Sequence, residues 1–350
     1  MMVPIAINGR PIGTGHPAYI IAELSANHGG SFERAVEIIH AMKESGADAV
    51  KLQTYTADTL TIRSDREEFK IKDMMWEGKT LHDLYGEAFT PWEWEPKLKA
   101  EAEKIGLDCF STPFDASAVD FLSQMNVPAY KIASFEITDL PLIAAAAAQG
   151  KPLIISTGMA STEEIAEAIN AAKGVGNNQV ILLKCTSAYP AQAEEMNLRT
   201  IPDMRERFGV PVGLSDHSLE LSVPVAAVSL GACVIEKHFC LSRKESGPDT
   251  PFSLEPQEFR AMVDAVRKTE AAIGHVSYGP TEREKGGMRY RRSLYAVAHI
   301  AKGELFTEHN VRSIRPAGGL PPKELPRILG KKAARTIEHG TPLAWEMVAD

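Results

Sequence analysis

Eight short apolar runs recur along the first two thirds of the chain, and nearly every one ends in a charged or hydroxyl-bearing residue. They read YIIAE, AVKLQ, CFST, AYKIAS, PLIIST, VILLKCTS, VGLSDH and CVIEKH. Near-continuous runs of this kind, separated by helix-length segments, are typical of buried parallel strands. Eight such strands predict an α/β fold, a closed (β/α)8 or TIM barrel, whose strands all end at one mouth where the chemistry takes place. The polar residues that end the runs are therefore predicted to share one pocket.

The composition fits this fold and excludes several other classes. The 350 residues are 44% hydrophobic and 24% charged, so the chain can bury one large core and carry a second, small domain. A net charge of −8 argues against nucleic-acid binding, and an anionic substrate would need locally placed cations. Because no apolar run reaches the about 18 residues of a membrane span and the N-terminus lacks a signal-peptide pattern, we expect a cytoplasmic protein without a membrane partner.

The segments between the runs carry helical periodicity, except for one long connection. Helices are predicted in SFERAVEIIHAMKESG, residues 96–106, TDLPLIAAAAAQG, STEEIAEAINAAKGVG and residues 223–231. The connection over residues 54–96 is too long for a simple turn and carries Trp76, Trp92 and Trp94. We interpret it as a partial lid over the barrel mouth. The alternative is an insertion that packs its three tryptophans onto the barrel rim.

The alternation of strands and helices stops near Gly279. This predicts a barrel domain over 1–280, of which 1–18 form an N-terminal extension, a polar linker over 281–293 and a small domain over 294–350. In the small domain, IAKGELFTEHNV from Ile300 and IEHGTPLAWEMV from Ile337 place Ile, Gly and Val at the same offsets. The repeat predicts a mostly β fold of two related halves. By composition alone, a packing or oligomerisation role ranks ahead of a catalytic one.

Two histidines lie at the ends of the last two runs. His217 follows the seventh run and His238 ends the eighth, and neighbouring strands about 4.8 Å apart would bring both imidazoles to one cation. A single histidine at a strand end is more often structural, but two of them with Asp216 and Glu236 beside them favour a metal. With two protein nitrogens, the other coordination positions would belong to water and substrate, which favours an open, catalytic divalent ion.

Lysines and hydroxyls form a second pattern. Lys51, Lys131 and Lys184 fall within the runs, where an ammonium is costly to bury unless it faces a ligand or a carboxylate. Hydroxyls near the run ends are donors suited to phosphate or carboxylate oxygens, at Thr112, Ser134, Ser156, Ser187 and Ser215. Taken singly, each hydroxyl is more typical of a backbone-bonded strand end. Together, and with Glu23 across from them, they predict an anion cradle that faces a metal.

These residues lie in motifs that resemble the sialic acid synthase family over almost the whole chain. The motifs are IIAELSANHGGSFERA, GADAVKLQTYTADTLTI, FSTPFD, YKIASFEITDLPLI, IISTGMA, GLSDHS and VIEKHF, and the tail is similar to the antifreeze-like (SAF) domain of that family. ELSANH, LQTYTADTLTI and PWEW point to its pseudaminic acid branch more than to its N-acetylneuraminate branch.

The resemblance implies an activity and a set of functional residues. It implies a homodimer, in which the small domain of one subunit covers the active site of the other, and the condensation of phosphoenolpyruvate with a 2,4-diacetamido-2,4,6-trideoxyhexose. His217 and His238 would bind Mn2+, with Mg2+ or Co2+ as alternatives. Phosphoenolpyruvate would be held by Lys51, Thr112, Lys131, Ser134, Ser156, Ser215 and, where the family usually has Asn, Ser187. The sugar would face Glu23, Gln53, Tyr189, Glu236, Asp249 and, from the partner subunit, Arg315.

Several alternatives remain open at this point. Either Glu23 or Glu236 suits the proton transfers. Within the family, the product could be N-acetylneuraminate or a legionaminate. A Schiff-base aldolase would instead use Lys131 or Lys184 as its nucleophile and need no metal. A non-enzymatic carbohydrate-binding or ice-binding protein is a further rival, although such a protein has no physical reason to keep so many charges at the strand ends.

Overall fold

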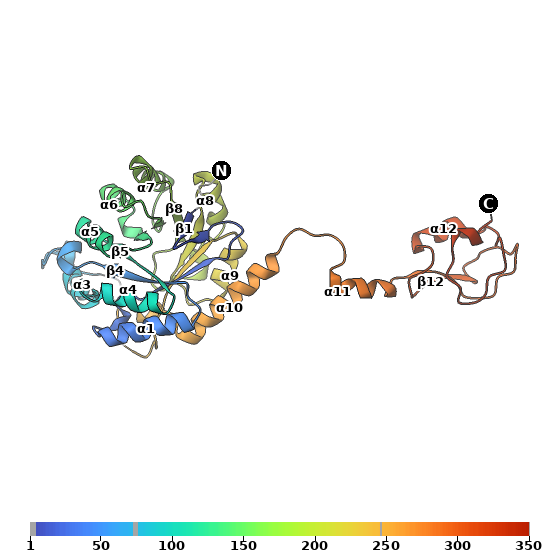
Figure 1. Ribbon diagram of the computed structural model, residues 1–350, viewed down its shortest axis with the longest axis horizontal. Coiled ribbons are helices and arrows are strands. Elements are labelled where there is room, and N and C mark those ends of the chain that lie inside the picture. The colour runs from blue at the N-terminus through green and yellow to red at the C-terminus, as the bar shows by residue number, and fades with distance from the viewer. Residues whose placement is uncertain (1–4, 73–75, 246, 350) are drawn as a thin grey trace. The chain divides into compact units, whose positions relative to one another are not determined.

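Eight parallel strands form a closed barrel in the part of the chain that the structure describes, residues 5–72, 76–245 and 247–349 of a computed structural model (Figure 1). Its strands are β3 (Tyr19–Glu23), β4 (Ala49–Thr54), β5 (Asp108–Pro113), β6 (Tyr130–Ile132), β7 (Leu153–Ser156), β8 (Val180–Cys185), β9 (Val212–Asp216) and β10 (Val234–His238). β10 pairs with β3 and closes the barrel. The predicted TIM barrel and its eight strands are confirmed.

Helices surround the barrel in the alternation that the sequence predicts (Figure 1). They are α1 (Phe32–Glu44), α4 (Glu95–Lys104), α5 (Ala116–Gln124), α6 (Leu140–Ala147), α7 (Thr162–Gly174), α8 (Thr200–Phe208), α9 (Ser222–Ser229) and α10 (Pro256–Ile273). A capping box formed by Ser161 and Glu164 begins α7 at the predicted STEE motif. Among the described helices, none has the length and apolarity that crossing a membrane requires.

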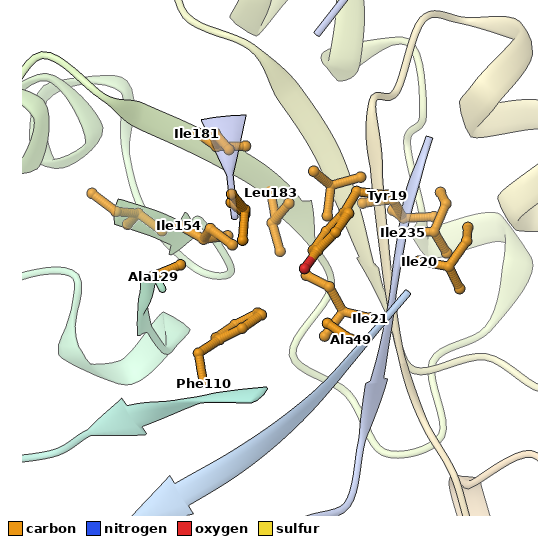
Figure 2. Close-up of a cluster of buried hydrophobic side chains, with 14 of the residues drawn as sticks. Tyr19, Ile20, Ile21, Ala49, Phe110, Ala129, Ile154, Ile181, Leu183 and Ile235 are labelled. Carbon is orange, nitrogen blue, oxygen red and sulfur yellow. The ribbon is translucent and has the colours of Figure 1, made fainter. Parts of the chain in front are cut away.

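Large apolar side chains fill the barrel below its mouth. Figure 2 shows Tyr19, Phe110 and Leu183 pointing toward one another between the strands. The Tyr19 hydroxyl donates to Asp108 Oδ2 at 2.5 Å, at the amino ends of the strands. The N-terminal extension adds a hairpin, β1 (Ile5–Ile7) and β2 (Arg10–Ile12), whose Asn8 also donates to Asp108. The barrel is therefore a packed core that leaves room for ligands at its carboxyl end.

The long insertion over residues 54–96 has its own secondary structure, and hydrogen bonds connect its two ends to each other and to the barrel. It contains α2 (Ala57–Leu60) and α3 (Leu81–Ala88). At its two ends, the Thr54 hydroxyl donates to Glu95 Oε2 at 2.7 Å and lies 2.6 Å from the Ser111 hydroxyl. Glu95 is fully buried, and burial raises its pKa to about 8. A protonated carboxyl therefore connects the end of β4 to the start of α4.

Contacts divide the chain into two units, Met1–Gly274 and His275–Asp350. The smaller unit pairs β11 (Ser293–Ala296) with β12 (Val311–Ile314), and Ile300 bridges Ile337. Its backbone hydrogen bonds repeat at an offset of 37 residues, the separation of Ile300 and Ile337. The Gly303 amide donates to the Ala333 carbonyl, and the Gly340 amide, 37 residues later, donates to the Ala296 carbonyl, 37 residues before Ala333. This pattern fits the two related halves predicted from the repeat. The predicted linker contains α11 (Glu282–Lys285), and the predicted domain limits stay a prediction.

The buried Glu95 carboxyl predicts a pH-dependent stability. Its pKa lies at 4.5 in the unfolded chain and at about 8 in the fold, so the stability that the protonated carboxyl contributes is present below 4.5 and is lost as the pH rises toward 8. Glu95→Gln should leave urea unfolding near pH 4 almost unchanged and raise the free energy of unfolding at pH 8 by about 4 kcal/mol. The exposed neighbour gives the control, since Glu93→Gln should change neither value. Equal stability of Glu95→Gln and wild type at pH 8 would contradict this account.

Candidate active site

Four charged side chains meet under the barrel mouth. Lys51 of β4 pairs with Glu23 of β3, and its Nζ lies 3.7 Å from Glu236 Oε1 of β10. Lys131 of β6 places its Nζ 3.6 Å from the same Glu236 oxygen. All four side chains are buried, with 1–6% of their surface exposed. Two cations and two carboxylates therefore compensate one another in this charge cluster. A single buried charge without such a partner would be strongly destabilising.

The predicted hydroxyls surround this charge cluster. Lys51 donates to Thr112 at 3.3 Å, Lys131 donates to Ser156 at 2.6 Å, and Ser215 donates to Glu236 at 3.3 Å. Ser134 accepts from the Gly158 amide at 3.1 Å, and the Ser187 hydroxyl approaches the same glycine. A Cβ at Gly158 would collide with both serine hydroxyls, so a larger residue would displace them. The structure thus brings together the seven residues predicted to hold phosphoenolpyruvate.

The charge cluster separates the pKa values of its two carboxyls. Burial, reinforced by Glu236, raises the pKa of Glu23 to about 7 even though Lys51 opposes the shift. Burial acts on Glu236 in the same sense, but Lys131 and Lys51 outweigh it and lower its pKa. Burial lowers the pKa of Lys131. Glu236 therefore stays ionised at neutral pH, whereas Glu23 can exchange a proton there.

The two predicted metal ligands lie side by side at the strand ends. The ring centroids of His217 and His238 are 5.4 Å apart. Nδ1 of His217 donates to the Thr186 carbonyl at 3.0 Å, whereas Nδ1 of His238 is buried without a hydrogen-bond partner among the described residues. Burial, together with His217 and Lys51, holds the pKa of His238 well below its usual value, so its imidazole is neutral. In the described part of the chain, no group of three or more His, Cys, Asp or Glu side chains forms a metal site.

A buried ion pair lies behind the histidines and was missed by the sequence reasoning. Lys237 donates to Asp216 Oδ2 and to the Ser218 carbonyl, and both charged side chains are fully buried. Asp216 Oδ1 also accepts from the Ser218 amide at 2.9 Å. Asp216 therefore supports the turn that carries His217, and its carboxylate is engaged by Lys237 and not directed to the predicted metal. The only available signal was alternation, since Lys237 lies between two residues that face the mouth.

A cavity of about 350 Å3 extends from the strand ends toward the insertion. Among the residues predicted to face the sugar, Gln53, Tyr189 and Asp249 line this cavity together with His238. Glu23 and Glu236 lie in the charge cluster. Burial raises the pKa of Asp249, which accepts from the Ser25 hydroxyl. Arg315 does not belong to this group, because it is exposed on the loop after β12 in the smaller unit.

Glu136 is a cavity residue that the sequence reasoning did not select. It ends a short 3-10 turn after β6, and it follows Ser134 by two residues. Its Oε2 is buried without a hydrogen-bond partner among the described residues, and burial raises its pKa to about 7. Its position after an apolar run was the signal that could have identified it.

The three tryptophans of the insertion have different positions. Trp76 lines the cavity, and its Nε1 donates to the Pro248 carbonyl at 3.2 Å. Trp92 donates to the Tyr55 carbonyl, and Trp94 packs edge-on against His28 and Phe32. The insertion therefore contributes one wall of the cavity through Trp76, while the other two tryptophans pack it onto the barrel. Residues 73–75 lie outside the described part.

A barrel whose mouth buries paired cations and hydroxyls beside a sugar-sized cavity defines an enzyme class that handles a small anionic substrate. The chain belongs to the NeuB family, whose model matches residues 38–278, and a SAF domain matches residues 291–349. The resemblance to the sialic acid synthase family is thereby confirmed, as is the SAF domain in the tail.

Known relatives cover nearly the whole chain. The pseudaminic acid synthase of Campylobacter jejuni is 48% identical over 330 residues, which are 94% of this chain and 96% of that protein. The N,N'-diacetyllegionaminic acid synthase of Legionella pneumophila is 36% identical over 98% of both chains. The crystal structure of N-acetylneuraminic acid synthetase from Leptospira borgpetersenii, in complex with citrate, superposes with a TM-score of 0.73 at 31% identity and covers 82% of this chain and 96% of that one.

Proposed function

We propose that this chain is a pseudaminic acid synthase. It would condense phosphoenolpyruvate with 2,4-diacetamido-2,4,6-trideoxy-β-L-altropyranose and water, giving pseudaminic acid and phosphate by C–O cleavage. The observation that carries this proposal is the pair of buried ammonium groups, Lys51 and Lys131, under strand ends whose Gln53 and His238 line a cavity of about 350 Å3. The 48% identity to a relative named pseudaminic acid synthase supports the choice of product over the 36% identity to a legionaminic acid synthase.

The cradle has the donors that phosphoenolpyruvate needs. Lys51 and Lys131 would bind its phosphate and carboxylate, and the hydroxyls of Thr112, Ser134, Ser156, Ser187 and Ser215 would complete the shell. The two lysines contact carboxylates, so an arriving anion would compete with Glu23 and Glu236 for them. A substrate with several negative charges wins this competition more readily than a neutral one.

The histidine pair fits a divalent metal. Nδ1 of His238 is buried without a partner among the described residues, and the adjacent His217 ring gives a second nitrogen from the neighbouring strand. The neutral His238 imidazole, with open positions beside it, suits Mn2+, with Mg2+ or Co2+ as alternatives. Such an ion supplies polarisation of the aldehyde oxygen of the open-chain sugar and lowers the pKa of a bound water.

The protein side of the reaction follows from the charges. Lys51 and Lys131 would hold phosphoenolpyruvate so that its C3 can attack the sugar carbonyl carbon. Glu236, kept ionised by the lysines, would place negative charge near the cation that develops at C2. Glu23, with a pKa of about 7, would take the proton from the water that adds to C2. The tetrahedral intermediate would then lose phosphate by cleavage of its C–O bond.

The rivals fit less well. A Schiff-base aldolase needs a free amine, but Lys131 faces Glu236, and Lys184 donates to the Cys185 carbonyl at 2.8 Å and to Thr186. A purely carbohydrate-binding protein would not need two buried cations under the strand ends. The N-acetylneuraminate and legionaminate products stay open within the family, because they share the same chemistry.

A homodimer would complete the site. We propose that Arg315 of one subunit reaches the sugar bound in the other, where its guanidinium would donate to an acetamido oxygen. Support comes from its exposure in a unit that is separate from the barrel. The cytoplasmic location stays a prediction.

Phosphate release gives the direct test of the activity. With phosphoenolpyruvate and Mn2+, we expect release with the 2,4-diacetamido-2,4,6-trideoxy-L-altrose and only background with N-acetylmannosamine, and EDTA should abolish the signal because it removes the ion from His217 and His238. Phosphate release with N-acetylmannosamine but not with the altrose sugar would agree with the family and contradict pseudaminic acid as the product. Release that persists in EDTA would reject the metal site.

The role of Glu23 predicts a pH profile. Because kcat/KM reports the free enzyme and the base must be ionised, kcat/KM should rise with pH until about 7 and then level off. Glu23→Gln should lower kcat by about 100-fold or more and remove this rise, while calorimetry should still detect phosphoenolpyruvate binding. Glu136→Gln is the matched control, because Glu136 also has a pKa of about 7. Loss of the rise in Glu136→Gln instead would assign the base to Glu136.

Mixing two inactive variants tests the dimer. Arg315→Ala should lose the partner's contribution to the site, and Glu23→Gln should lose the base. If the small domain serves the other subunit, co-expressed heterodimers contain one intact site, and the mixture should recover about a quarter of the wild-type activity. A mixture no more active than its two components would show that Arg315 does not act across subunits.

A further inference from the structure

Ser25 follows β3 in a backbone conformation that serine rarely adopts. Its φ is 50°, in the left-handed region that favours glycine, and it begins the 3-10 turn η1 (Ser25–His28). The residue is buried and lines the cavity. A strained conformation of this kind persists only where the surrounding contacts hold it. A serine in a place that glycine would fill without strain indicates that the hydroxyl has a role.

Two groups of Ser25 contact two different carboxylates. Its amide donates to Glu23 Oε1 at 2.9 Å, and its hydroxyl donates to Asp249 Oδ2 on the loop that follows β10. The Ala26 amide adds a longer bond, at 3.3 Å, to the same Asp249 oxygen. Asp249 also lines the cavity. The turn therefore holds the Asp249 carboxylate by one oxygen and leaves the other oxygen to a ligand.

The main chain of Asp249 is fixed by a different residue of the same turn. Nδ2 of Asn27 donates to the Phe239 carbonyl and to the Ser253 hydroxyl, both at 2.9 Å. The Ser253 hydroxyl in turn donates to the Asp249 carbonyl at 2.6 Å. Without the Ser25 hydroxyl, these bonds would keep the path of the loop, and only the Asp249 carboxylate would lose a donor.

We propose that Ser25 is a positioning residue that orients the Asp249 carboxylate toward the sugar. The inference rests on the proposed function, in which Asp249 faces the sugar. A carboxylate already held by two donors loses less freedom on binding than one that can rotate, so its second oxygen is directed at a sugar hydroxyl or an acetamido N–H. The Ser25 hydroxyl also favours the ionised carboxylate, the stronger acceptor, against the burial that raises the pKa of Asp249.

Ser25→Gly removes the hydroxyl and keeps the backbone conformation, because glycine adopts a φ of 50° without strain. We expect the KM for the sugar to rise by about 10-fold with kcat nearly unchanged, since Asp249 would bind the sugar equally in the ground state and in the transition state. The KM for phosphoenolpyruvate should stay within about 2-fold of wild type, because the amide of residue 25 still donates to Glu23.

Ser25→Ala separates the hydroxyl from the backbone. Both variants lack the hydroxyl and should show the same rise in KM, but alanine keeps a Cβ at a positive φ and should have a Tm about 2 °C or more below that of Ser25→Gly. A purely structural role would instead make the KM follow the Tm. Asn126→Gly is the matched control for a change to glycine, because Asn126 has a φ of 49° and is exposed just after α5. It should leave the KM of both substrates unchanged.

A double-mutant cycle shows whether Ser25 acts through Asp249. Asp249→Ala should raise the KM for the sugar by itself, and adding Ser25→Gly should change that KM by less than about 2-fold, because the hydroxyl no longer has its partner. Where the turnover of Asp249→Ala is too low to measure, the calorimetric Kd of the sugar gives the same comparison. A full effect of Ser25→Gly in the Asp249→Ala background would show that Ser25 acts by another route and would overturn the inference.

The choice of sugar separates this inference from the proposed function. If wild type uses the altrose sugar and Ser25→Gly leaves its KM unchanged, the function stands and the role of Ser25 is wrong. If wild type uses N-acetylmannosamine instead and Ser25→Gly raises the KM for that sugar by about 10-fold, the role of Ser25 stands and the product is wrong. If wild type releases phosphate with no sugar, both are wrong.

Discussion

Four buried charges under the barrel mouth determine how the site works. Lys51 and Lys131 share Glu236, and Lys51 also pairs with Glu23. Removing one partner from such a buried pair typically costs about 3–5 kcal/mol, because the remaining charge is left uncompensated. The charge cluster therefore fixes the positions of its members before any ligand arrives. It also holds Glu236 ionised while burial brings Glu23 to a pKa of about 7.

Strand register assembles the charge cluster. Glu23 lies opposite Lys51 on one neighbouring strand and opposite His238 on the other. Because side chains alternate, Lys237 faces the other way and pairs with Asp216 behind the mouth. A shift of one residue in β10 would exchange these two sets and place a lysine where the histidine belongs. Barrel stability and site geometry therefore depend on the same register.

Sequence periodicity predicted the strands and the mouth residues because both depend on local alternation and on strand ends. Contacts between distant segments could not be predicted in this way. Asp216 was expected beside a metal, but it pairs with Lys237, which only the neighbouring strand reveals. Trp76 lines the cavity while the other two tryptophans of the insertion pack onto the barrel, although all three carry the same local signal. Glu136 follows an apolar run, but only the fold shows that its carboxylate lines the cavity.

The charge cluster and the insertion would recognise different parts of the substrates. Under the proposed function, the charge cluster would bind groups that every substrate of this chemistry shares, an enol phosphate and a carbonyl, so it would not distinguish one sugar from another. Discrimination must come from the remote end of the sugar, where binding energy can still favour the correct orientation of the reacting carbon. The insertion lines the cavity with apolar side chains and with Tyr55 and Tyr85, and it is joined to the barrel through Thr54 and Glu95. Under the proposed function, a change of product would therefore require changes in the insertion and none in the charge cluster.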